Sequence, residues 1–478
     1  MKFRRVFSKV PWLEVVVLLT IGIVLSANLL SIPAIGMADN GDFGRMMAKV
    51  GLEHASERPE ERYFNFFERI YKIVPATTPL LGDFLSSEAF FHQAAFWFGL
   101  PFAQNGLWDI RFLGGLHIFA LLLAVGSILA ATRSLRFIQR LCVAAFLILF
   151  LTDLRLMAYL NSFYSEPAFV IFLCFWLAAA VHWIRKPGRN WVAMILFYLL
   201  SGLLLTVKTQ NTLMGFIFAA GGLGIGYLKK DRKQIAAAIA LSAALILITA
   251  AYFQLTPQRF KRANLFNIVF HDILATSNAS ETLAFFNLPD DLAAFSGRDY
   301  YMEGGLVNDP EFNRIFFQRT NFSDVLRYYF SHPAWVFQQL NRGSKQILTM
   351  QLDFLGNHEK ASGLPKLSQV EKFTFWSDFK EKFLPKTSLF LIGIYSASVI
   401  GGLLSWLRQP TARPFVVVFL ILVGISALQF AMTMLVGGMR DPAKQLWQFN
   451  LIWDAIFGFG VVGLLGILFR KVTTDPNG

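Results

Sequence analysis

Long apolar segments recur along this chain and are separated by polar stretches of very different length. A helix needs about 20 residues to cross the hydrocarbon core of a membrane, and ten segments reach or approach that length. They cover residues 12–34, 108–131, 138–160, 167–184, 190–208, 211–228, 234–255, 388–407, 414–436 and 448–469. We therefore predict an all-α polytopic membrane protein with about ten transmembrane helices.

Lysine and arginine gather beside alternate ends of these segments. The clusters are Lys2, Arg4, Arg5 and Lys9; Arg133, Arg136 and Arg140; Arg185, Lys186 and Arg189; Lys229, Lys230, Arg232 and Lys233; Arg408 and Arg413; and Arg470 and Lys471. Ten spans place all six clusters on one side, which the positive-inside rule makes the cytoplasm. We expect an integral protein of a bacterial cytoplasmic membrane with both termini cytoplasmic.

The spans divide the remaining chain into two large extracytoplasmic parts. Residues 1–34 hold the first span, 35–107 a first outer loop, 108–255 spans two to seven, 256–387 an insertion, and 388–478 the last three spans. Within the first loop, the aromatic-rich segments 63–71 and 84–98 are too short or too polar to cross, and we expect them to form interfacial helices. The insertion carries helical patterns and is expected to be mostly helical.

Composition excludes several other classes of protein. The chain is 55% apolar and 16% charged, as in membrane proteins, and anionic lipid headgroups explain its net charge of +13 without nucleic acid. Cys142 and Cys174 both fall inside spans, and the seven histidines lack ligand spacing. The first span is longer than the apolar core of a signal peptide, so we interpret it as a retained anchor.

Carboxylates lie near the start of the first loop and at the end of the second outer turn. Asp39 and Asp42 flank Asn40-Gly41, a dipeptide that favours a tight turn able to aim both carboxylates at one point. Two adjacent carboxylates can divide the work of a proton acceptor and an orienting group. Glu166 follows Asn161 and Tyr164 in the second outer turn, where capping of the next helix is an equally simple role.

Cations and amides occupy two later outer turns. Lys208, Gln210 and Asn211 form a polar cluster between two apolar spans, although a lysine at a span end can also reach the interface by extending its side chain. The last turn contains Arg440, Asp441 and Lys444, which supply positive charge for a lipid phosphate or form surface pairs. Asp454 lies about two turns into the final span and should face a cavity or a partner.

This layout resembles the GT-C superfamily of membrane glycosyltransferases in its architecture and in the Asp39/Asp42 region. The resemblance implies a polyprenyl-phosphate-linked sugar donor, a glycan, lipid or protein acceptor, and membrane lipids as surroundings. It makes Asp39 or Asp42 the general base, with Glu166 orienting the acceptor. We expect Lys208, Arg440 and Lys444 to bind the donor phosphate, with Asn161, Tyr164, Gln210, Asn211 and Asp441 completing the substrate site.

The acidic pattern here is Asp-x-x-Asp, whereas adjacent acids or Asp-x-Asp are usual in that superfamily, and this difference leaves metal dependence open. We predict no metal ligands and no obligatory cofactor, with a divalent cation as the alternative. A transporter or flippase, a lipid-linked glycan polymerase or ligase, and a structural assembly factor are the competing functions. A transporter predicts ionisable residues at the midplane, whereas most charges here lie at the outer rim.

Overall fold

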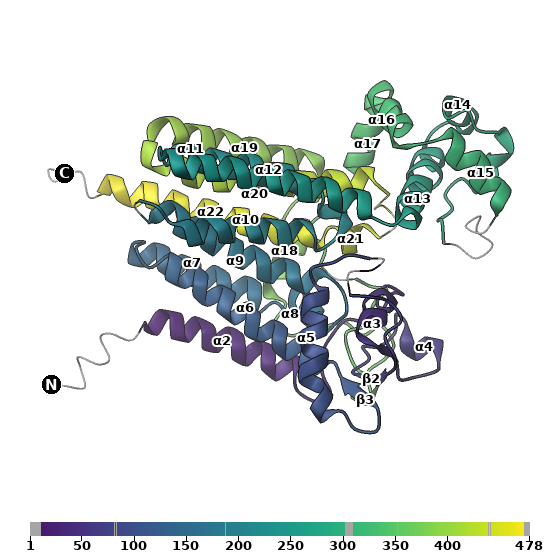
Figure 1. Cartoon of the computed structure of the whole chain (residues 1–478), viewed down its shortest axis with the longest axis horizontal. Coiled ribbons are helices and arrows are strands. Elements are labelled where there is room, and N and C mark those ends of the chain that lie inside the picture. The colour runs from purple at the N-terminus through teal and green to yellow at the C-terminus, as the bar shows by residue number, and fades with distance from the viewer. Residues whose placement is uncertain are drawn as a thin grey trace.

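The computed structural model describes residues 11–472 except 81, 83, 187, 302–308, 351, 438 and 440, and side chains of the last helix as far as residue 466. Most of the chain is helical, and the long helices lie side by side in one bundle (Figure 1). The beginning of α2 and the end of α22 lie at one end of this bundle. The first loop and the insertion lie at the other, which we call the loop end (Figure 1).

Each of the ten predicted segments contains a helix, but the helices differ in length. Seven are long and apolar enough to cross a membrane: α2 (Trp12–Leu29), α6 (Arg111–Ala131), α9 (Glu166–Arg185), α12 (Arg232–Leu255), α19 (Ser388–Arg408), α20 (Arg413–Leu435) and α22 (Trp447–Val472). The described residues therefore confirm a helical membrane protein with seven candidate spans. The count of ten stays a prediction.

The remaining three segments are bent or short. The segment predicted at 138–160 forms α7 (Phe137–Leu151) and α8 (Leu154–Met157), with a 60° bend, and counts as an eighth span if the bent pair crosses as one. The bend falls where Asp153 caps α8 by accepting a hydrogen bond from the Arg155 amide. Helices α10 (Trp191–Leu205) and α11 (Met214–Leu228) have 15 residues each.

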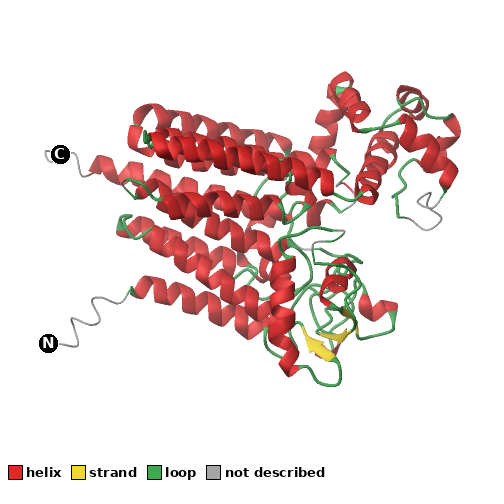
Figure 2. Cartoon of the chain, viewed as in Figure 1, coloured by secondary structure: helices red, strands yellow, loops and turns green. Residues whose placement is uncertain are grey.

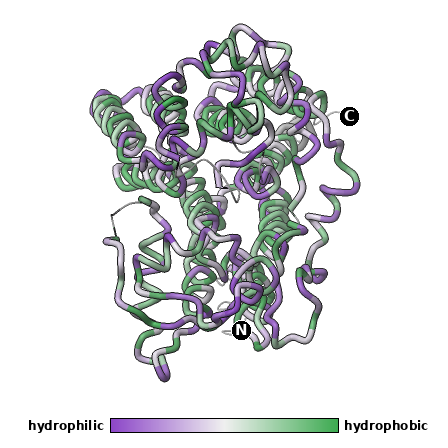
Figure 3. Tube along the Cα trace, turned by 90° about the vertical axis from the view of Figure 1, so that its right-hand side faces the viewer, coloured by the Kyte–Doolittle hydropathy of each residue, from purple (hydrophilic) through white to green (hydrophobic). Residues whose placement is uncertain are grey.

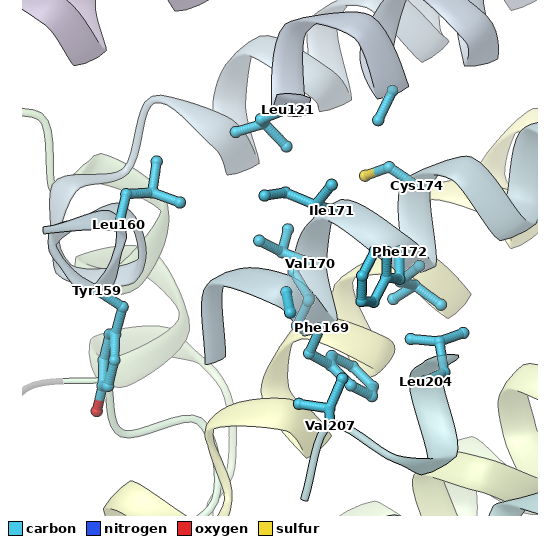
Figure 4. Close-up of a cluster of buried hydrophobic side chains, with 14 of the residues drawn as sticks. Leu121, Tyr159, Leu160, Phe169, Val170, Ile171, Phe172, Cys174, Leu204 and Val207 are labelled. Atoms are coloured by element: carbon cyan, nitrogen blue, oxygen red, sulfur yellow. The ribbon is translucent and has the colours of Figure 1, made fainter. Parts of the chain in front are cut away.

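Helix α9 forms the centre of the bundle. Within its apolar 18-residue stretch, 72% is buried inside the protein, compared with 11% for α19. This burial is possible because the side chains of α9 are apolar on every face of the helix. Side chains of α9 pack against Leu121 of α6, Leu160 and Leu204 in the cluster shown in Figure 4. The loop preceding α9 is consequently held at a fixed position at the loop end.

Charged residues at the end opposite the loops pair with one another. Arg133 and Arg140 both donate to Oε1 of the buried Glu14, at 3.1 and 3.0 Å. Seen from the loop end, hydrophilic residues follow the loops and hydrophobic residues follow the helices (Figure 3). This separation of polar and apolar residues agrees with a membrane-embedded bundle, while its orientation in the membrane stays a prediction.

The first loop contains a small β-sheet, so the prediction of an all-α protein is wrong in this region. Strands β1 (Leu52–His54), β2 (Ile70–Ile73) and β3 (Leu107–Asp109) form an antiparallel sheet in the order β1-β2-β3 (Figure 2). The interfacial helix expected at 63–71 is likewise absent, because this segment pairs its backbone with neighbouring segments. Tyr71 of β2 is fully buried between them.

The second expected interfacial helix is present as α5 (Ala89–Gly99). It runs across the ends of the bundle helices rather than along them (Figure 1). Phe90, Trp97 and Phe98 are more than half exposed on its surface. Exposed aromatic side chains on a helix in this direction fit the headgroup level of a membrane.

The insertion is mostly helical in its described residues, as predicted. Helices α13 (Gln258–Phe266), α14 (Ala279–Phe285), α15 (Pro310–Arg319), α16 (Phe322–Ser331) and α17 (Pro333–Ser344) surround an aromatic core of their own. Residues 356–358 then lie against the first loop, where Gly36 and Ala38 donate backbone hydrogen bonds to Asn357 and Gly356. The insertion therefore also holds the start of the first loop in place.

Helix α18 (Phe375–Phe383), also from the insertion, pairs with the last span. Lys380 lies 2.8 Å from Oδ2 of Asp454, and both side chains are 1% exposed. The Trp376 indole donates a further hydrogen bond to Asp454, at 2.9 Å. The expectation that Asp454 faces a cavity or a partner is confirmed, since Lys380 is that partner.

Candidate functional site

A polar pocket lies at the loop end where five segments far apart in sequence meet. It encloses about 380 Å³, including the part open to solvent. Its lining residues are Asp42, Arg45, Met46, Phe84, Phe163, Tyr164, Ser165, Glu166, Lys208 and Lys444. Two carboxylates and three cations thus surround one small volume.

Asp42 enters the pocket from a turn that precedes α3 (Gly44–Val50). The turn forms because Oδ1 of Asp39 accepts hydrogen bonds from the amides of Gly41, at 2.7 Å, and Phe43, at 3.0 Å. Gly41 has a φ of 96°, a backbone conformation that residues other than glycine rarely adopt. Asp39 therefore shapes the turn, and Asp42 is presented by it.

The Asp42 carboxylate is paired with two cations. Its Oδ2 lies 2.7 Å from Nζ of Lys444, and its Oδ1 pairs with the Arg45 guanidinium. Burial alone would raise the pKa of Asp42, but Lys444 and Arg45 outweigh it and hold the pKa well below its ordinary value of 3.8. Without a bound substrate, Asp42 is therefore fully ionised.

Lys444 reaches the pocket from α21 (Pro442–Gln445), the short helix before the last span. Its side chain is 3% exposed, and its ammonium lies 4.1 Å from the centre of the Tyr164 ring. A cation placed over an aromatic face is attracted to the ring as well as to the carboxylate. Lys444 is consequently held between Asp42 and Tyr164.

Glu166 and Lys208 form the second ion pair of the pocket. Oε1 of Glu166 lies 3.3 Å from Nζ of Lys208, with the carboxylate 2% exposed and the lysine 20% exposed. Glu166 is the first residue of α9, where the helix dipole favours a negative charge. The capping role and the pocket position expected from the sequence are therefore compatible.

Tyr164 links the turn that carries Asp42 to the loop before α9. Its hydroxyl donates to the backbone oxygen of Ala38 at 2.9 Å and accepts from the amide of Asn40 at 3.0 Å. Burial raises the pKa of Tyr164 well above its ordinary value, so the hydroxyl stays protonated. The two sequence regions that supply the carboxylates are thus joined directly.

Arg45 also lines the pocket, although its position in the sequence predicted no role for it. Its guanidinium lies 5.3 Å from the ring centre of Phe84 and 5.1 Å from that of Phe260 in α13. The pocket edge is therefore in contact with the insertion. The available signal was the spacing of Asp42 and Arg45, three residues apart at the beginning of a helix, which is a common pairing distance.

Asp39 does not line the pocket, contrary to the expectation that both first-loop carboxylates aim at one point. It is 3% exposed, and its Oδ2 lies 3.2 Å from Nε2 of His54. Asn161 is also placed elsewhere: it is fully buried and donates to the backbone oxygens of Leu29, at 2.6 Å, and Ile35, at 2.8 Å. Both residues hold the first loop in position.

Gln210 and Asn211 contact α20 instead of the pocket. Gln210 donates to the Gln429 side chain at 2.9 Å, and Gln429 in turn donates to Asn211 at 2.8 Å. Asp441 precedes α21 and is absent from the pocket lining, and Arg440 lies outside the described residues. The pocket thus brings together Asp42, Tyr164, Glu166, Lys208 and Lys444 from the predicted set.

No metal site is evident within the described ranges, where no group of three or more His, Cys, Asp or Glu side chains is arranged to hold an ion. Glu88 contacts His117 at 2.8 Å and His92 at 3.3 Å, and the side chains of all three are buried. Oε2 of Glu88 also accepts a hydrogen bond from the Ala168 amide in the first turn of α9. This cluster connects α5, α6 and α9.

The fold and this pocket define a polytopic α-helical membrane protein with a polar pocket at one end of its helix bundle. The chain belongs to the family described as the YfdI N-terminal transmembrane domain, whose family model matches residues 2–477. The match covers nearly the whole chain, including both loop regions. Neither the curated proteins nor the solved structures contain a significant match.

Proposed function

We propose that this protein is a membrane glycosyltransferase of the GT-C type that uses a polyprenyl-phosphate-linked sugar on the extracytoplasmic side. The observation that carries this proposal is the meeting of Asp42 and Glu166 with Lys208 and Lys444 in one pocket at the loop end. A polyprenyl chain stays in the hydrocarbon while its phosphate lies at the interface. A pocket at the end of the helices meets that phosphate without extracting the lipid.

The cations supply the phosphate site. Lys444 and Lys208 enter the pocket from different turns, and Arg45 is the third cation of its lining. Three positive charges therefore surround a space suited to one phosphate group. When the bond between the sugar C1 and the phosphate oxygen breaks, negative charge grows on the leaving polyprenyl phosphate. Cations that the fold holds in place around the pocket stabilise that charge.

Asp42 is the candidate general base. In the proposed reaction an acceptor hydroxyl oxygen bonds to C1, its proton passes to the Asp42 carboxylate, and polyprenyl phosphate leaves with the electron pair of the broken bond. Asp42 is a weak base while Lys444 and Arg45 hold its pKa low. A donor phosphate that draws these cations away would raise that pKa, so that basicity develops only with the donor bound.

The experiment is a transfer assay on purified protein with a panel of polyprenyl-phosphate sugars and candidate glycan, lipid and protein acceptors. We expect acceptor-dependent release of polyprenyl phosphate with one donor. Loss of a general base costs about 10²- to 10⁴-fold in rate, and we expect Asp42→Asn to show a loss of that order.

Asp353→Asn is the matched control, because Asp353 is an exposed aspartate of the insertion and lies outside the pocket. Its rate should equal that of the wild-type protein. Equal rates for Asp42→Asn and the wild-type protein would refute the assignment of the base. Uptake of a labelled substrate into vesicles without any transfer would favour the transporter instead.

A further inference from the structure

His54 lies between two carboxylates of the first loop. Its Nε2 is 3.2 Å from Oδ2 of Asp39, and its Nδ1 contacts Oε2 of Glu68. The imidazole is 8% exposed. Because each ring nitrogen faces a carboxylate oxygen, both nitrogens act as donors, and this requires the doubly protonated ring.

The two carboxylates that contact His54 also hold backbone amides. The second oxygen of Asp39 accepts the Gly41 and Phe43 amides that form the turn before α3. The second oxygen of Glu68 accepts the amides of Ala55, at 2.8 Å, and Ser56, at 3.2 Å. One imidazolium therefore links the Asp42 turn to the segment after β1.

We infer that His54 is a positioning residue whose protonated ring fixes Asp39, and through Asp39 the turn that presents Asp42 to Lys444. The consequence for catalysis rests on the proposed function, whereas the consequence for the turn does not. The chain of contacts is direct: His54 to Asp39, Asp39 to the Gly41 and Phe43 amides, and the turn to Asp42.

The charge of the ring depends on what surrounds it. Burial alone would lower the pKa of His54. The hydrogen bonds to Asp39 and Glu68 outweigh burial and raise the pKa to about 9. Two other titratable groups face the ring, Tyr63 and Tyr71, with ring centres 5.3 and 5.9 Å away. Burial keeps Tyr71 neutral by raising its pKa well above the ordinary value.

Loss of the proton should release the turn. A neutral imidazole has one donor and one acceptor nitrogen, so it can bind only one of the two carboxylates. The other carboxylate would be left buried beside a like charge without its cation. Because the pKa is raised, the holding contact is complete below the ordinary value of 6.5 and is lost as the pH rises through about 9.

The first readout is amide hydrogen exchange of the full-length protein in detergent, followed by mass spectrometry of peptides that cover residues 39–43. With intrinsic rates corrected for pH, the wild-type turn should lose roughly tenfold or more in protection between about pH 7 and about pH 10. His54→Gln should lack that protection already at about pH 7. Peptides from α9 should stay protected in both proteins, which shows that the variant is folded.

The second readout is the pH dependence of sugar transfer. The wild-type rate should fall as the pH passes about 9, and His54→Gln should lower kcat roughly 10- to 100-fold while the KM for the donor changes little. His182→Gln is the control, because His182 is exposed in the last turn of α9, far along the helix from the pocket, and should leave both readouts unchanged.

An unchanged turn in His54→Gln at neutral pH would overturn the inference, as would wild-type protection that is the same on both sides of the His54 titration. Absence of transfer with every donor tested would instead count against the proposed glycosyltransferase. The exchange result would still decide the role of His54.

Discussion

Nζ of Lys444 lies 2.7 Å from Oδ2 of Asp42, although 402 positions separate the two residues in sequence. The pair joins the first loop to the turn before the last span, and both residues line the pocket. Lys444 is almost completely buried, whereas the Asp42 side chain keeps 39% of its surface exposed. An incoming anion could therefore reach this cation from the side of the carboxylate.

Lys444→Met should weaken binding of polyprenyl phosphate without an attached sugar. A hydrogen bond to a charged group contributes about 1.5–3 kcal/mol, so we expect a loss in affinity of about 10- to 100-fold. Direct binding to the purified protein measures it. Lys366→Met, which changes an exposed lysine of the insertion, should bind as the wild-type protein does.

Protonation of Asp42 should make the protein less stable in acid. Its pKa is lowered below 3.8, so its contribution to stability is present above that value and is lost as the pH falls below it. Solvent screens this half-exposed group, and we expect only about 1 kcal/mol. Melting temperatures of wild-type protein and Asp42→Asn between about pH 5 and about pH 3 should converge as the pH falls; parallel curves would contradict the pairing.

Lys208→Met should destabilise the protein because it leaves Glu166 buried without its cation. Breaking a fully buried pair costs about 3–5 kcal/mol, and the loss should be smaller here because Lys208 is partly exposed. The double variant Lys208→Met/Glu166→Gln should recover most of the melting temperature. Transfer should remain low in the double variant if Lys208 also binds phosphate, whereas recovery of transfer would assign it a structural role only.

The Lys380–Asp454 pair should be important for docking α18 onto the last span. Both side chains are 1% exposed, so Lys380→Met should lower stability by about 3–5 kcal/mol. Lys380→Met combined with Asp454→Leu removes both charges and should restore most of this loss. Thermal unfolding in detergent provides the comparison, and additive losses in the double variant would argue against a coupled pair.

Gly114→Ala should disturb Asn161 rather than a sugar site. A Cβ at position 114 would lie 1.9 Å from Oδ1 of Asn161, which is held by Leu29 and Ile35. Overpacking of this kind costs about 1–3 kcal/mol. Gly115→Ala is a matched control, since nothing lies within 4 Å of its added Cβ, and its melting temperature should be unchanged.

The helices of the bundle could be predicted from the sequence because the length of each apolar segment is counted directly along the chain. Every predicted apolar segment contains a helix, and Asp454 was expected to need a partner. The segment 63–71 shows where this reasoning fails. Its aromatic residues suit a membrane surface equally well as a helix or as a strand, and only pairing of Ile70 and Tyr71 with Asp109 and Trp108 selects the strand.

The candidate site was predicted in part, for a related reason. Asp42, Glu166, Lys208 and Lys444 sit beside span ends, so their common depth follows from the spans. Asp39 has the same depth and the same chemistry as Asp42. Its side chain turns inward because the Gly41 and Phe43 amides and His54 bind it, and these contacts form only when the loop has folded.

The apolar segments and their flanking charges are enough to identify a helical membrane protein, to place residues near the ends of its spans, and to show where opposite charges are available. Which of those charges meet depends on the folded bundle, which pairs Lys444 with Asp42 and Lys208 with Glu166. The two kinds of interaction differ in their range. Hydrophobic burial acts residue by residue along a segment, whereas an ion pair acts over a few ångströms between segments that only the packed bundle brings together.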